Sequence, residues 1–178
     1  MNLNAIRLLR PAAVSFIAAL FLACSAETAE DGTEEGAEEE LRTTGITAIS
    51  VNRSTGFRPP ASPGRCHPAG RWNVDFKTGM LTGNACVDGT PVSLNRTLSE
   101  AELGQVKSAV SKVRTTVRPA SCPTDMPVNS LVARTGASET NYVEARAACG
   151  AGTAVTAATL SPLVDLMGRL SVVAANAR

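Results

Sequence analysis

The chain has 178 residues, a formal net charge of +1, and a single His, a single Trp and a single Tyr. One His, without any Cys-x-x-Cys pair, excludes the usual ligand spacings of a zinc site. Neither a P-loop nor a dinucleotide-binding glycine pattern occurs in the sequence, so the sequence contains neither of these nucleotide-binding motifs. We therefore expect no metal and no cofactor.

The first 23 residues predict a secretory signal peptide. Arg7 and Arg10 precede an apolar run from Pro11 to Ala23, which only Ser15 interrupts. A permanent membrane-spanning helix needs about 20 apolar residues, and this run instead has the length of a signal-peptide core. The pattern therefore predicts an exported protein from which residues 1–23 are removed.

The segment that ends the signal peptide reads Leu-Phe-Leu-Ala-Cys over residues 20–24. It resembles the cleavage box of bacterial lipoproteins, in which the Cys becomes the new N-terminus and receives lipid such as palmitate. The resemblance implies that Cys24 anchors the protein to a membrane of the cell envelope, and Ser25 after it implies the outer membrane. The alternative is ordinary cleavage, which would give a secreted or periplasmic protein.

The charge along the mature chain is strongly uneven. Residues 25–40 hold eight acidic residues and no basic one. Such a segment repels itself and buries too little apolar surface to fold, so residues 24–40 predict a lipidated Cys followed by a disordered tether. Residues 41–178 form the expected single globular domain and carry 15 Lys and Arg against 8 Asp and Glu, a difference of +7.

A basic domain of this kind can attract an acidic envelope polymer by Coulomb forces. The alternatives are a protein partner, or two chain segments whose charges simply offset one another. Nucleic acid is not an expected partner outside the cytoplasm.

The cysteines predict disulfides. The sequence has five, and lipid on Cys24 leaves four in an exported domain, which is the pattern of a disulfide-bonded fold. Among the three possible connectivities we favour the sequential one, Cys66–Cys86 and Cys122–Cys149. Their sequence separations are 20 and 27 residues, and each closed loop would stabilise the fold by about 3 kcal/mol.

Residues 71–96 predict a three-stranded meander. Trp72, Val74 and Phe76 alternate with polar residues, which is the period of a half-buried strand. A turn at residues 78–79 and a strong two-residue turn at Asp88-Gly89 would separate the strands. These turns predict the cross-strand pairs Trp72–Ala85, Val74–Gly83, Phe76–Leu81, Ala85–Val92 and Gly83–Leu94, all on one face of the sheet.

Two helices and further strands complete the expected fold. Ser99 with Glu102 forms a capping box for the first helix, whose buried stripe is Leu103, Val106, Val110 and Val113 and which cannot continue through Pro119. Ser161-Pro162 begins the second helix, with Leu163, Leu166, Met167 and Leu170 facing inward. Strands are predicted at 46–51, at 128–133 and, as a partner of the latter, at 141–147. This order predicts an α+β domain, an antiparallel sheet made of the meander and a second hairpin, with both helices on one face.

Two loops are candidates for binding. The first, from Arg53 to Arg71, also holds Arg58 and Arg65 among four prolines, so it would display basic groups on a restricted backbone. The second reads Cys122, Pro123, Thr124, Asp125, Met126 and Pro127 and resembles the reactive loop of bacterial subtilisin inhibitors. That resemblance implies that Asp125 or Met126 lies at the bond that a protease binds. For both loops the alternative is a plain surface connection.

No catalytic residue is predicted. His67 and Cys66 are neighbours whose side chains point apart in an extended chain, and a disulfide-bonded sulfur is not a nucleophile. No Gly-x-Ser-x-Gly supports a serine hydrolase, and Trp72 falls on the inner face, which disfavours a sugar site built on stacked aromatic rings. The sequence therefore predicts a non-enzymatic envelope lipoprotein that binds a partner or has a structural role. The alternatives are a protease inhibitor and a small hydrolase centred on His67.

Overall fold

The computed structural model describes residues 39–56, 62–118, 126–148 and 152–176. Several predictions concern residues outside these ranges and are not tested by the structure. They are the signal peptide, the lipid anchor on Cys24, the tether as far as residue 38, the pair Cys122–Cys149, Arg58, Pro119, and the loop residues Pro123, Thr124 and Asp125.

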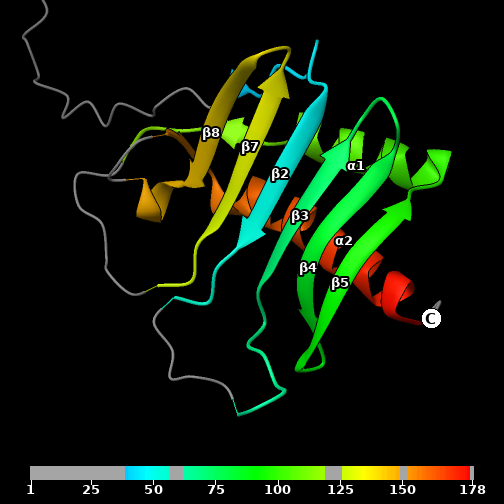
Figure 1. The fold of residues 1–178 in the computed structure, drawn as a ribbon. Coiled ribbons are helices and arrows are strands. Elements are labelled where there is room, and N and C mark those ends of the chain that lie inside the picture. The colour runs from blue at the N-terminus through cyan, green and yellow to red at the C-terminus, as the bar shows by residue number, and fades with distance from the viewer. Residues whose placement is uncertain (1–38, 57–61, 119–125, 149–151, 177–178) are drawn as a thin grey trace, which may run out of the picture. The chain divides into compact units, whose positions relative to one another are not determined.

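The described residues form one mixed sheet with two helices packed on the same face (Figure 1). The strands follow the spatial order β1-β6-β9-β8-β7-β2-β3-β4-β5, and all neighbours are antiparallel except β8 and β9, which are parallel. The strands are β1 (Glu39–Glu40), β2 (Ala48–Arg53), β3 (Gly70–Asp75), β4 (Met80–Val87), β5 (Thr90–Thr97), β6 (Arg114–Thr115), β7 (Asn129–Thr135), β8 (Ser138–Glu144) and β9 (Thr153–Val155). The helices are α1 (Glu100–Ser111), the 3₁₀ turn η1 (Ala145–Ala147) and α2 (Ala157–Asn176).

The α+β class is confirmed, but the expected sheet of a meander plus a separate hairpin is too simple. Strand β2 lies between β3 and β7 and joins the two groups into one sheet. The short strands β1, β6 and β9 extend the sheet beyond β8, and the parallel pairing of β9 makes it mixed. The predicted tether is two residues too long, because Glu39 and Glu40 pair with β6 and Glu40 forms an ion pair with Arg114. Strands of two or three residues carry too few side chains to show a period in the sequence.

The turn between β4 and β5 confirms the sequence prediction. Asp88 and Gly89 have φ values of 49° and 75°, and such positive angles at both central residues are what a two-residue hairpin turn requires. The predicted pairs Ala85–Val92 and Gly83–Leu94 are both present.

The predicted register between β3 and β4 is wrong by two residues. Trp72 lies opposite Gly83 and Val74 opposite Leu81, because the loop between the strands has four residues, 76–79, rather than two. The Asp75 carboxylate stabilises the longer loop by accepting from the amides of Lys77 and Thr78 at 2.8 and 2.7 Å, and the Thr78 amide also holds the pKa of Asp75 below its ordinary value. A shift of two residues keeps every side chain on its predicted face.

Helix α1 begins as predicted. The Oγ of Ser99 accepts from the Glu102 amide at 3.3 Å, and the Glu102 carboxylate accepts from the Ser99 amide at 2.8 Å. Val106 and Val110 are fully buried on its inner face. The helix ends at Ser111, so Pro119 is not what terminates it, and the buried Val113 already lies beyond its end.

Helix α2 begins at Ala157, four residues before the predicted Ser161 cap, and Pro162 lies inside it. The first turn is held by Thr156, whose carbonyl accepts from the amides of Thr159 and Leu160, both at 3.1 Å. Pro162 is tolerated because the bond it cannot make would go to the carbonyl of Ala158, an exposed residue that water can reach.

Helix α2 is the core helix of the domain. Its length and a mean hydropathy of 1.3 over Ala157–Ala174 would suffice for a membrane span. However, four of its large side chains are packed against the sheet and are less than 7% exposed, as predicted: Leu163, Leu166, Met167 and Leu170.

Candidate functional site

The Cys66–Cys86 disulfide is the first element of the candidate site. It joins the segment before β3 to β4, with the two Cα atoms 5.7 Å apart, and confirms this half of the predicted connectivity. Two backbone bonds of 3.0 Å reinforce the link, from the Cys66 amide to the Gly89 carbonyl and from the Cys86 amide to the Ala69 carbonyl. The disulfide therefore fixes the loop that carries His67 against the end of the sheet.

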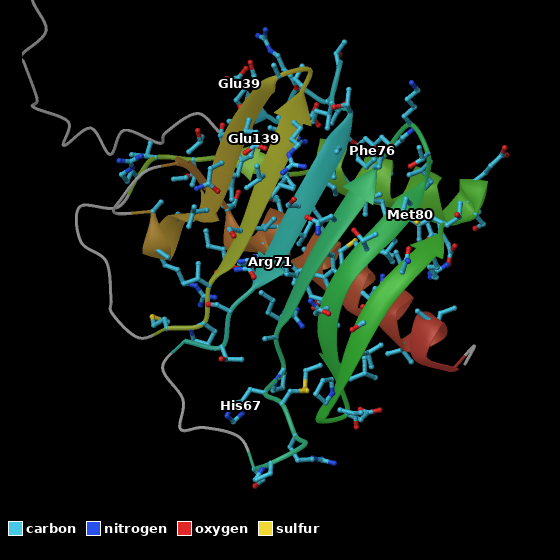
Figure 2. The ribbon with its side chains drawn as sticks, viewed as in Figure 1. Glu39, His67, Arg71, Phe76, Met80 and Glu139 are labelled. Atoms are coloured by element: carbon cyan, nitrogen blue, oxygen red, sulfur yellow. A yellow bond between two sulfur atoms is a disulfide. The ribbon has the colours of Figure 1, made fainter. Side chains whose placement is uncertain are left out.

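A cavity of about 320 Å³ opens beside this disulfide. We call it the disulfide pocket; its lining residues are Asn52, Arg53, Cys66, His67, Ala69, Gly70, Arg71, Asn84, Ala85, Cys86 and Pro91. Figure 2 shows two of its polar residues, His67 in the loop that leads to β3 and Arg71 on that strand. The predicted basic loop thus contributes three nitrogen-bearing side chains to one cavity, those of Arg53, His67 and Arg71.

Three polar side chains lie in one row across the pocket. Arg71 is directly opposite Asn52 on β2 and directly opposite Asn84 on β4. Because directly opposed side chains share a face and neighbouring strands lie about 4.8 Å apart, the guanidinium has an amide on each side. Arg71 is exposed, so a ligand in solution can reach this row.

The charge of the pocket is not neutralised from within. Arg53 is paired with Asp165 of α2. Arg71, in contrast, forms no ion pair with any carboxylate in the described ranges, and no Asp or Glu is among the residues that line the pocket. A guanidinium between two amides can bind a carboxylate or phosphate through several donors at once.

His67 is half-buried in this pocket. Its neighbour Cys66 is held in the disulfide and cannot act as a nucleophile. Cys66 and His67 therefore do not form a nucleophile–base pair, and a hydrolase centred on His67 stays a prediction. Among the residues with assigned positions there is also no cluster of three His, Cys, Asp or Glu that could hold a metal ion.

The other candidate site residues that the structure describes lie outside the disulfide pocket. Met126 is 36% exposed, but its neighbours Pro123, Thr124 and Asp125 lie outside the described ranges, so the inhibitor loop stays a prediction. Trp72 is 2% exposed, which confirms that it belongs to the core and offers no stacking surface. The Arg65 guanidinium packs against Gly89 at the β4–β5 turn and does not line the pocket.

A larger groove of about 710 Å³ lies between α1 and α2. Its lining is mostly small or neutral, with the exposed cations Lys112 and Arg169 among its residues. No charged group in it is flanked by paired amides as Arg71 is, so the disulfide pocket is the better candidate for a specific site.

Sequence reasoning found Arg53, His67 and Arg71 but missed Asn52 and Asn84. The sequence did hold a clue to them, because Asn is unfavourable in strands and yet both residues lie within strand-forming segments. Comparisons with protein families, with curated proteins and with solved structures found no match to this chain.

Proposed function

We propose that this chain is an exported, lipid-anchored envelope protein whose globular domain binds an acidic envelope polymer and catalyses no reaction. The observation that carries the binding function is the exposed Arg71, set between Asn52 and Asn84 in a pocket that no described carboxylate lines. The net charge of +7 over residues 41–178 supports the same polarity of ligand.

The proposed export of the protein to the cell envelope is supported by two independent features. One is the signal-like segment that ends at Cys24. The other is the Cys66–Cys86 disulfide, because structural disulfides persist in oxidising compartments such as the periplasm and the cell surface. In this proposal the acidic segment from residue 25 to residue 38, which precedes β1, keeps the basic domain at a distance from the lipid.

A polymer is a better match than a small anion for physical reasons. An exposed charge pair contributes only about 0–1 kcal/mol, so one carboxylate on Arg71 would bind weakly. A polymer carries many such charges. Many anchored copies of the protein could therefore bind one polymer chain at the same time, with a much higher avidity than a single copy has for a single anion.

Mass spectrometry of the protein purified from membranes tests the proposed export and lipid anchor. We expect an N-terminus at Cys24 that carries acyl chains, and no free thiol among the other four cysteines. An intact N-terminus at Met1 in a cytosolic pool with four reduced thiols would overturn the proposal.

The binding function is tested by retention on an immobilised polyanion, polygalacturonate, at physiological salt. Arg71→Ala should release the protein at clearly lower salt than the wild type. Arg169→Ala is the matched control, because it removes an exposed arginine that lies on α2 and not in the disulfide pocket. Equal effects of the two substitutions would show that binding depends on the net charge of the domain and not on the pocket.

A further inference from the structure

The face of the sheet opposite the helices carries an unusual set of side chains. Each of the four strands β2 to β5 presents one asparagine to this face, and these residues are Asn52, Asn73, Asn84 and Asn95. Apolar residues of the same strands, such as Val51, Val74 and Leu94, alternate with them and are buried on the helix side. We call these four residues the asparagine face.

The asparagine face is continuous with the disulfide pocket. Asn52, Arg71 and Asn84 lie in one cross-strand row, while Asn73 and Asn95 are both directly opposite Thr82 and form the adjacent row. From β2 to β5 the face spans three strand intervals, or about 14 Å. Arg71 thus lies inside a surface of neutral hydrogen-bonding groups rather than in a cluster of cations.

Asparagine in these positions is contrary to local preference. It is depleted in strands, where Thr, Val and Tyr are favoured, and none of the four residues is in a turn. Four unfavourable residues on one face of four adjacent strands are a repeated departure from the local rule. Such departures concentrate at functional sites, where binding compensates the loss of stability.

Two hydrogen bonds orient amides of this face. Ser50 Oγ donates to Asn73 Oδ1 at 2.6 Å, and Ser93 Oγ donates to Asn84 Oδ1 at 3.2 Å. Each bond engages the amide oxygen. The NH₂ groups of Asn73 and Asn84, which can donate two bonds each, are therefore left to groups outside the sheet.

We infer that the disulfide pocket and the asparagine face form one extended site for an acidic polysaccharide. Arg71 takes the carboxylate of a sugar acid, and the asparagines exchange hydrogen bonds with hydroxyl groups of the neighbouring sugars. This inference rests on the proposed function and specifies the chemical class of its polymer.

The composition of the face favours a sugar chain over other polyanions. A polyphosphate or an acidic peptide carries a charge on nearly every unit and would be matched by a row of cations, whereas Arg71 is the sole cation in the two described rows from β2 to β5. Sugar hydroxyls both donate and accept, as do asparagine amides. Trp72 is buried and offers no stacking surface, so the two described rows would recognise the ligand by hydrogen bonds and charge.

The test measures binding of two probes to the mature protein in detergent by calorimetry. The probes are a galacturonic acid hexamer and tripolyphosphate, which is a polyanion without hydroxyl-bearing sugars. The variants are Arg71→Ala, the double variant Asn84→Ala/Asn95→Ala, and Gln105→Ala, which removes an exposed amide from α1. Asn84 and Asn95 are exposed, and thermal melts would confirm that the variants are folded.

We expect the double asparagine variant to bind the hexamer at least fivefold more weakly and to lose clearly less affinity for tripolyphosphate, because Arg71 and Asn52 of the anion site remain. Arg71→Ala should weaken the binding of both probes, and Gln105→Ala should leave the binding of both unchanged. Unchanged hexamer binding by the double variant would overturn the polysaccharide inference while leaving the anion site intact. No effect of Arg71→Ala on either probe would overturn the proposed function as well.

Discussion

The indole Nε1–H of Trp72 donates a hydrogen bond of 2.8 Å to the Oγ of Ser171, which itself donates to the Met167 carbonyl at 2.8 Å. This chain of two bonds connects the centre of the sheet to α2 in the buried core, where Ser171 is 0% exposed. A buried indole N–H needs a partner, and Ser171 supplies it, so the single Trp of the protein can lie in the core.

Replacing Ser171 by Ala should lower the free energy of unfolding by about 1–2 kcal/mol, because the indole N–H would remain buried without an acceptor. Urea unfolding measures the change. Ser108→Ala, at an exposed position of α1, is the control and should change stability little. A Trp72→Phe background should remove most of the Ser171→Ala effect; full additivity would show that the bond contributes nothing.

The pair Arg96–Glu102 predicts a stability change in acid. Arg96 donates two bonds to the Glu102 carboxylate at 3.0 and 2.9 Å, and this interaction lowers the pKa of Glu102 to about 2. Since the folded-state pKa lies below that of the unfolded chain, the stabilisation is present above about pH 4.5 and is lost as the pH falls towards 2. Linkage sets an upper limit of about 3 kcal/mol, and because both side chains are 23% exposed we expect about 1–2 kcal/mol.

Glu102→Gln should therefore flatten the pH dependence of unfolding between pH 4.5 and pH 2, as measured by thermal melts. Glu100→Gln changes an exposed carboxylate in the same first turn of α1 and should leave the slope nearly as in the wild type. The same loss of slope in both variants would contradict a specific role of the Arg96 pair.

Gly83 should tolerate no side chain. It has a φ of 145° and faces Trp72 across the β3–β4 pair, and a Cβ there would lie 2.0 Å from the Arg71 carbonyl oxygen. We expect Gly83→Ala to cost about 3 kcal/mol or more. In contrast, Gly104→Ala in α1, where a Cβ meets nothing within 4 Å, should stabilise by about 0.5–1 kcal/mol. Denaturant midpoints of the two variants should move in opposite directions.

Removal of the Cys66–Cys86 disulfide should affect both stability and binding. Its closed loop of 20 residues corresponds to about 3 kcal/mol in the chain-entropy account. The double variant Cys66→Ser/Cys86→Ser should unfold at lower urea and bind polygalacturonate more weakly, because the segment that carries His67 would no longer be fixed at the pocket. Wild-type binding by a destabilised double variant would mean that this segment does not shape the site.

Asn95→Thr should separate stability from function. Thr is favoured in strands and Asn is not, within a scale of about 1 kcal/mol, so we expect a gain of a few tenths of a kcal/mol in the free energy of unfolding. Binding of the galacturonic acid hexamer should weaken in the same variant. A loss of stability would instead assign Asn95 a role in the fold.

Features encoded within a few residues were predictable from the sequence. The Ser99–Glu102 capping box and the Asp88-Gly89 turn depend on hydrogen bonds and dihedral preferences of adjacent residues, and both were confirmed. The alternation around Trp72 placed it on the buried face even though the register was wrong by two residues. The Cys66–Cys86 pair was favoured among three connectivities on the expectation that the protein is exported, and the structure contains it.

Other features depended on the tertiary structure. The central position of β2, the parallel pairing of β9 with β8, and the start of α2 at Ala157 are decided by which surfaces are buried together. The candidate site has the same origin, because Asn52, Arg71 and Asn84 become neighbours only when three strands pair in one register. By itself the sequence determined caps, tight turns and buried faces, since local backbone and side-chain preferences specify them. Only the tertiary structure decided which distant strands are neighbours, since that choice minimises the exposed apolar surface of the whole chain.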